Sequence, residues 1–129
     1  MEDILKKANE LGLMIKGTEI AQRFSELSKM LESDKENREL LEEYINAMNE
    51  YHEKESEGRQ IEVEEKTKIK ELTEKVSENQ LIKEYIATHS YFINMMMQVQ
   101  EAISEPKGEP IAESKIIKPG NSGKIITGV

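Results

Sequence analysis

The sequence contains no cysteine, and this absence excludes several kinds of site. Disulfides, thiolate zinc sites, cysteine-ligated iron–sulfur clusters and cysteine nucleophiles all require a thiol. Tryptophan is also absent, and aromatic residues make up only 5% of the chain. Because proteins that bind single-stranded RNA stack bases on aromatic rings, this scarcity disfavours direct RNA binding.

Long apolar runs are missing as well. None approaches the roughly 20 residues that span a bilayer. The first ten residues, MEDILKKANE, are amphipathic and lack the apolar core of a signal peptide. The net charge of −8 disfavours non-specific binding to nucleic acid or to an anionic membrane. We therefore expect a soluble cytoplasmic protein with no membrane partner.

Charged residues are plentiful, at 34% of the 129 residues, and Glu and Lys are the commonest of them. This composition favours long amphipathic helices, and the length suffices for one domain with a modest core. The charge is uneven: residues 32–65 carry thirteen acids and four bases, a net of −9. Such a block is usually a solvated helix face, and the alternative is a docking surface for a basic partner.

Apolar periodicity and capping residues predict helices over about 3–15, 35–57, 62–77 and 80–104, and a further helix capped by Thr18. Asp3 is the candidate cap of the first helix. Ser33, in a capping box with Glu36, and Asp34 compete as caps of the third. Ser77 and Asn79 compete for the last, and Gly58 is a plausible stop for the third.

The two long helices, 35–57 and 80–104, are joined through residues 58–79, so we expect them to pair as an antiparallel hairpin. The predicted fold class is all-α: a helical bundle built on this long antiparallel hairpin, with short N-terminal helices and a flexible C-terminal tail. The domain covers residues 1–105 and the tail 106–129. The tail holds all three prolines and four of the seven glycines, which excludes a packed helix. It is either disordered in the free protein or a segment that docks on a partner through apolar pairs such as Ile116 and Ile117.

Known catalytic and metal-binding motifs fail on inspection. A zinc HExxH motif would start at His52, but Ser56 stands where the second histidine is required. A di-iron bundle needs Glu-x-x-His twice, and Asn49 and Ile86 stand where the glutamates are required. No phosphate-binding glycine loop or GxSxG motif is present. We expect no catalytic residues, no cofactor and no metal.

His52 and His89 both lie on apolar stripes. Facing each other across a hairpin, they could bind a metal or respond to pH. The favoured interpretation is that each is a partly buried histidine with a hydrogen-bond partner.

Three consecutive methionines occur in the stretch FINMMMQV, residues 92–99. Neighbours on a helix are about 100° apart, so the three thioethers cannot converge on one metal ion. Met96 and Met97 flank the main apolar stripe of the last helix and are predicted to extend its core face. Met95 lies well off that stripe, near Tyr91 and Ala102.

The last helix is therefore apolar beyond one face, and a single hairpin cannot cover both sides. Either the short N-terminal helices or another subunit covers the second side. Flexible methionines suit an adaptable interface, and Met95→Glu is expected to disrupt assembly while helicity is retained. The candidate interface residues are Tyr91, Phe92, Met95 and Ala102, together with Ile116 and Ile117 of the tail.

Three stretches together carry a family resemblance. They are DILKKANELGLMIKGTEIAQRFSEL, then LESDKENRELLEEY, and finally ENQLIKEYIATHSYFINMMMQVQEAIS. Their order and spacing over about residues 3–105 resemble the YlbF/YmcA family of bacterial cell-fate regulators. The tail, with its isoleucines and glycines, is more similar to the YmcA branch.

The resemblance implies an all-α fold, oligomerisation and a non-enzymatic regulatory role. Family members act with related subunits and a PSP1-type protein in a complex that influences ribonuclease Y-dependent RNA processing. Through it they affect competence, sporulation and biofilm formation. Some members contribute cysteines to iron–sulfur clusters, a feature that a chain without cysteine does not share. The alternative is a structural homo-oligomer or chaperone-like clamp with no fixed partner.

Overall fold

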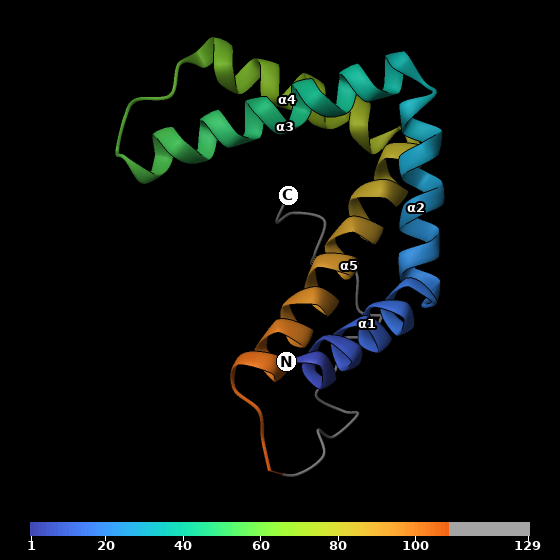
Figure 1. Cartoon of the computed structure of the whole chain (residues 1–129). Helices are drawn as coiled ribbons and strands as arrows, with labels where there is room; N and C mark the ends of the chain where they lie inside the picture. Colours follow the sequence, from blue (N-terminus) through green and yellow to red (C-terminus); the bar gives the residue numbers. More distant parts are fainter. Residues whose placement is uncertain (109–129) are drawn as a thin grey trace.

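The computed structural model describes residues 1–108, which fold into α-helices without any strand (Figure 1). The predicted all-α class is confirmed. The predicted helix 80–104 has the observed bounds, and the other predicted bounds differ by at most one residue. Ile116 and Ile117 lie outside the described residues, as does most of the predicted tail. The helices are α1 (Glu2–Lys16), α2 (Glu19–Glu32), α3 (Lys35–Ser56), α4 (Val63–Ser77) and α5 (Gln80–Ser104).

Side-chain caps begin three of the helices, and they decide between the alternatives that the sequence left open. Thr18 Oγ1 accepts a hydrogen bond from the backbone N–H of Ala21 at 3.1 Å, which confirms it as the cap of α2. Asp34, rather than Ser33, caps α3, and Asn79, rather than Ser77, caps α5. The prediction for α1 is wrong, because that helix begins at Glu2 and leaves Asp3 inside its first turn.

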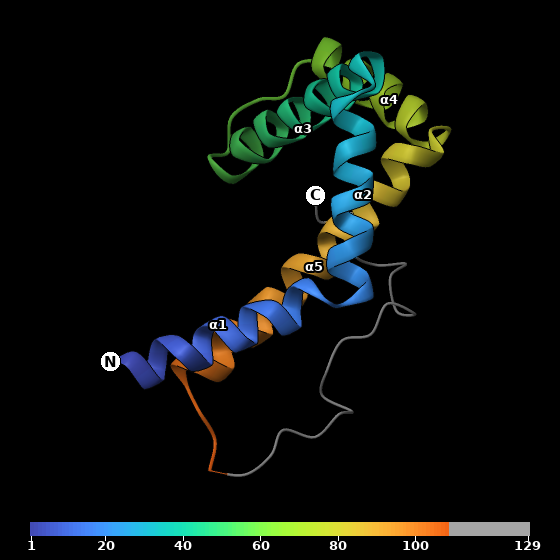
Figure 2. The ribbon, with the colours of Figure 1, turned by 45° about the vertical axis from the view of Figure 1, so that its right-hand side comes forward.

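Two pairs of helices meet at a corner (Figure 1). α3 packs along α4, α2 packs along α5, and the two pairs point in different directions. Figure 2 shows the same divergence after a 45° turn. The prediction that the two long helices, α3 and α5, pair with each other is therefore wrong. The connection over residues 57–62 is short, so α4 folds back directly along α3, and α5 is left to pair with α2.

The hydrophobic core lies at this corner. Its buried residues come from four helices, so the corner holds α2, α3, α4 and α5 together. Leu27 and Ile82 are fully buried. The buried cluster consists of Leu31, Leu41, Val76, Ile82 and Ile86, and the half-buried Leu40, Tyr44, Ile45, Leu81 and Tyr85 pack against it.

A short chain of polar side chains links the N-termini of α3 and α5. The Asn79 side-chain amide donates a hydrogen bond to Asn37 Oδ1 at 2.6 Å. The Asn37 amide in turn donates to Asp34 Oδ2 at 2.8 Å. Because Asp34 caps α3 and Asn79 caps α5, the capping residues of two helices are connected through a single asparagine.

Replacing Asn79 by alanine is expected to lower the free energy of unfolding by about 2 kcal/mol, the cost of a lost cap and a lost hydrogen bond. Asn79→Asp is the matched variant. It keeps an oxygen for the N–H of Ile82 but has no amide to donate to Asn37, so we expect a loss of about 1 kcal/mol. Chemical denaturation of both variants measures the two contributions, and equal losses would show that the cap contributes nothing.

Candidate functional site

An aromatic cluster fixes α2 on the middle of α5. Phe24 of α2 contacts three rings of α5, with centroid distances of 5.5 Å to Tyr85, 5.4 Å to His89 and 5.2 Å to Phe92. The three partners follow one another at helical spacing, so a single side chain of α2 covers about two turns of α5. Offset and tilted ring contacts of this kind add to the stability that comes from apolar burial.

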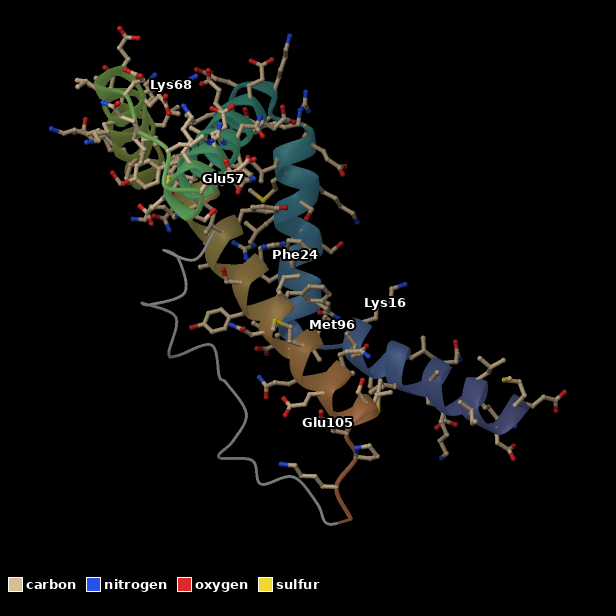
Figure 3. The ribbon with its side chains drawn as sticks, turned by 90° about the vertical axis from the view of Figure 1, so that its left-hand side faces the viewer. Lys16, Phe24, Glu57, Lys68, Met96 and Glu105 are labelled. Carbon is tan, nitrogen blue, oxygen red and sulfur yellow. The ribbon has the colours of Figure 1, made fainter. Side chains whose placement is uncertain are left out.

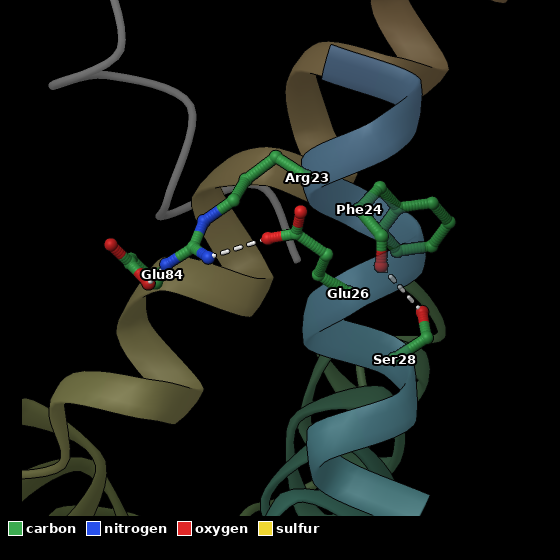
Figure 4. Close-up of polar contacts among 5 residues, drawn as sticks. All are labelled: Arg23, Phe24, Glu26, Ser28 and Glu84. Carbon is green, nitrogen blue, oxygen red and sulfur yellow. Dashed lines mark hydrogen bonds and ion pairs between the residues drawn. The ribbon is translucent and has the colours of Figure 1, made fainter. Parts of the chain in front are cut away.

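A polar contact lies beside this cluster (Figure 4). The Arg23 guanidinium donates hydrogen bonds to Glu26 Oε2 at 3.0 Å and to Glu84 Oε2 at 2.6 Å, so it joins α2 to α5. These bonds to Glu26 and Glu84 raise the pKa of Arg23 above its ordinary value. The pair is exposed, so it orients the two helices more than it stabilises them.

Beyond this cluster, the C-terminal half of α5 presents apolar side chains to solvent. Met97 is 64% exposed and Ile103 60%, and Ile93 and Met96 are also exposed. The prediction that Met96 and Met97 extend the core face is therefore wrong. α5 has 25 residues and its partner α2 only 14, so the apolar stripe of α5 continues past the helix that covers its beginning.

The predicted interface residues of α5 differ in how far they are buried. Tyr91 is 8% exposed, and Phe92 is half-buried because its ring stacks on Phe24 of the same chain. Met95 and Ala102 are half-buried. The chain's own α2 therefore covers Phe92, and contact of these residues with a partner stays a prediction.

α1 is the element whose importance the sequence did not reveal. None of its residues is buried, although its apolar side chains recur at helical spacing. Figure 3 shows α1 leaving α2 near Lys16 and diverging from α5, which continues to Glu105. We call the exposed apolar side chains of these two diverging helices the apolar arm surface. They are Ile4, Leu5, Leu13 and Met14 of α1 and Ile93, Met96, Met97 and Ile103 of α5.

The two histidines do not come together. His52 lies on the exposed side of α3, next to Tyr51, and His89 lies half-buried in the aromatic cluster. They do not face each other, since α3 and α5 diverge from the corner. Within residues 1–108, no three histidine, aspartate or glutamate side chains are grouped to hold a metal ion.

A hollow between α3 and the C-terminal part of α4 is lined mainly by acidic and amide side chains. Glu36, Glu39, Glu42 and Glu43 surround it, with Lys75 on its far wall. Small-molecule sites are usually enclosed and largely apolar, whereas this hollow is open and most of its lining residues are charged or amide residues. We interpret it as part of the solvated acidic face that the sequence predicted.

The described residues thus form a small all-α protein whose most distinctive surface is apolar and exposed, which is typical of proteins that act by contact with other proteins. In the described range, no helix combines the length and apolar content required to cross a membrane. Residues 4–106 match the model of the family described as "Control of competence regulator ComK, YlbF/YmcA". The chain belongs to this family, as the resemblance predicted, and its role is regulatory. The comparison with curated proteins found no match, and the comparison with solved structures found none either.

Proposed function

We propose that this chain is a non-enzymatic regulatory adaptor of the cytoplasm that binds other proteins through the apolar arm surface. The observation that carries the proposal is the exposure of eight large apolar side chains on α1 and on the C-terminal half of α5. Each Å² of apolar surface removed from water contributes roughly 25 cal/mol, so covering this surface is strongly favourable. Exposed apolar patches of this extent typically mark protein contacts.

The family membership suggests which partners and which cellular process the proposed adaptor serves. By resemblance, the partners are related family subunits and a PSP1-type protein, and the complex modulates ribonuclease Y-dependent RNA processing. Competence, sporulation and biofilm formation are the outputs that such a complex would influence. The strongly acidic block over residues 32–65 supports an effect on RNA through a partner rather than by direct binding.

The architecture suits an adaptor. The corner core and the Phe24 cluster hold α5 at one end and in its middle, which leaves its C-terminal half as a supported but uncovered arm. Methionine side chains in that arm adapt to the shape of a partner. The acidic α3 lies on the other side of the corner. Its charge can therefore attract or repel an approaching partner without being part of the contact surface.

Met97→Glu is expected to abolish capture of the partners when the tagged full chain is purified from its host and the complex is identified by mass spectrometry. A carboxylate at this exposed position would be buried without a counter-charge in the complex, which is costly. Helicity measured by circular dichroism should remain unchanged, since Met97 contributes nothing to the buried core.

Met95→Glu is the matched comparison, because it places the same charge on the side of the helix that the sequence favoured. Loss of partners with Met95→Glu but not with Met97→Glu would move the interface to that side. Full retention of the partners by both variants would overturn the proposed use of α5.

A chaperone-like protein without a fixed partner is the second candidate, and the exposed methionines favour it, because Met-rich surfaces bind many sequences. The same purification separates the two functions. One partner at stoichiometric amounts supports the adaptor, whereas many partners at low amounts support the chaperone-like protein.

A further inference from the structure

α5 has a second face that is buried or half-buried. At about 100° per residue, Tyr91 lies about 180° round the helix from Ile82, which is fully buried in the corner core. Tyr91 is itself only 8% exposed, and four half-buried residues share its side of the helix. We call this set the second face of α5, and it consists of Ala87, Tyr91, Met95, Gln98 and Ala102.

The packed helices do not account for this burial. The helices that pack most extensively on α5 are α2 and α4. α2 lies over another side, where Phe24 contacts Tyr85, His89 and Phe92. α4 meets α5 at the corner, and Tyr91 is not a member of the corner cluster. The exposed fraction of Tyr91 is that of a single chain, so no partner subunit supplies the cover.

We propose that the segment that follows α5, residues 109–129, folds back and covers the second face, with the apolar pair Ile116 and Ile117 against Tyr91. The segment continues the same chain, so its effective concentration at this face is high. It lies beyond the residues 4–106 that match the family, so the contact is a feature of this chain. The inference does not rest on the proposed function, since Met97 of the apolar arm surface points about 120° away from Tyr91.

The length and position of the segment fit this face. From Ala102 back to Ala87 the face is 15 residues of helix, or about 22 Å long. An extended chain advances about 3.3 Å per residue, so about seven residues span the face. If the chain reverses at Pro110, a segment that begins at Ile111 beside Ala102 brings Ile116 beside Tyr91.

The second face also contains a polar group that such a segment can satisfy. The side-chain amide nitrogen of Gln98 is buried and has no hydrogen-bond partner among residues 1–108. An unpaired buried donor is costly, whereas every residue of an extended segment carries a backbone carbonyl that can accept. A segment that passes over Gln98 would therefore provide the acceptor that the helices do not.

The charges of the two parts are opposite in sign. Residues 106–129 contain four lysines and two glutamates, a net of +2, whereas residues 1–105 have a net charge of −10. Attraction between the parts favours the folded-back arrangement. The apolar pair supplies the burial and the lysines flank it, since Lys115 and Lys118 stand on either side of Ile116 and Ile117.

The first test locates the segment by a disulfide. The chain has no cysteine, so Met95→Cys and Ser114→Cys can be introduced together in the full chain. With the spacing above, residue 114 lies beside Met95. In a glutathione buffer, we expect the ratio of disulfide to dithiol to be at least about tenfold higher than for Met97→Cys with Ser114→Cys.

Met97→Cys is the matched control, because it offers a more exposed thiol two residues away on a different side of α5. Mass spectrometry of the oxidised chains distinguishes bonds within a chain from bonds between chains. Equal ratios for the two pairs would overturn the proposal. Disulfides that form only between chains would assign the cover to another copy and would also overturn it.

The second test measures the access of solvent to Met95. Peroxide should oxidise Met95 more slowly than Met97, and mass spectrometry of peptides from the full chain follows each residue. Ile116→Glu with Ile117→Glu should raise the oxidation rate of Met95 at least about threefold, because carboxylates do not remain buried against an apolar face.

Ile125→Glu with Ile126→Glu is the control, since it makes the same change beyond the stretch that spans the second face. It should leave the oxidation rate of Met95 unchanged, and circular dichroism should show the same helicity for all three chains. No increase with the first pair of substitutions, or an equal increase with both pairs, would overturn the proposal.

Discussion

Replacing Ile82 by alanine is expected to lower the free energy of unfolding by about 2–5 kcal/mol. Ile82 is fully buried in the cluster that joins α2, α3, α4 and α5. The substitution removes apolar contacts and leaves a cavity where four helices meet, so little of the structure can relax into the space. Urea denaturation followed by circular dichroism measures the change.

Val63→Ala is the control for this prediction. Val63 is the first residue of α4 and is highly exposed, so its truncation should change the free energy of unfolding by no more than about 0.5 kcal/mol. The variants must be compared at one chain concentration, because association makes the unfolding midpoint concentration-dependent. Equal effects of the two substitutions would contradict the placement of the core at the corner.

Phe24→Ala is expected to cost about 3 kcal/mol, because it removes the side chain through which α2 contacts three rings of α5. The corner core should survive, since Phe24 is not a member of the buried cluster. The substitution should loosen the contact between α2 and α5, so hydrogen exchange should rise in α2 and in the middle of α5 more than in α3.

Phe24→Leu is the conservative control. It keeps most of the apolar volume but has no ring, so it should recover more than half of the stability that Phe24→Ala loses. Uniform acceleration of hydrogen exchange in all helices, with no preference for α2 and α5, would show that the aromatic cluster is not a separate point of attachment.

Helix caps explain which sequence predictions are confirmed by the structure. Thr18, Asp34 and Asn79 cap their helices through bonds to a backbone N–H three residues later. Such bonds are local, and for this reason the predicted range of α5, residues 80–104, agrees with the observed one. The choices between Asp34 and Ser33 and between Asn79 and Ser77 could not be predicted, since all four residues have the chemistry of a cap.

The pairing of helices is not a local property. α3 and α5 are the longest helices and both carry apolar stripes, yet α3 pairs with α4 and α5 with α2. The thin stripe of α4, with Leu72 and Val76 as its buried residues, is sufficient once a short connection returns that helix along α3. Periodicity shows that a helix has an apolar face, and it does not show which helix covers that face.

The exposed apolar surface of α5 differs from the predicted one because the sequence does not show which helix covers each face. Sequence periodicity correctly indicated that the last helix is apolar beyond one face. It assigned Met97 to the margin of the core stripe that includes Ile82, and Met95 to a second side covered by the N-terminal helices or by another subunit. In the structure that stripe is buried at Ile82 and Ile86, whereas Met97 beside it is exposed.

By itself, the sequence determined the all-α class, the bounds of four helices to within one residue, the absence of thiol chemistry and the family, because these follow from composition, local hydrogen bonds and residue order. Only the tertiary structure decided which parts of the apolar stripes are packed against another helix and which parts are exposed. That depends on the relative lengths of packed helices: α2 ends its contact with α5 well before α5 ends, and α1 turns away. The exposed arms are therefore a property of the assembled chain, since burial is decided between helices and not within them.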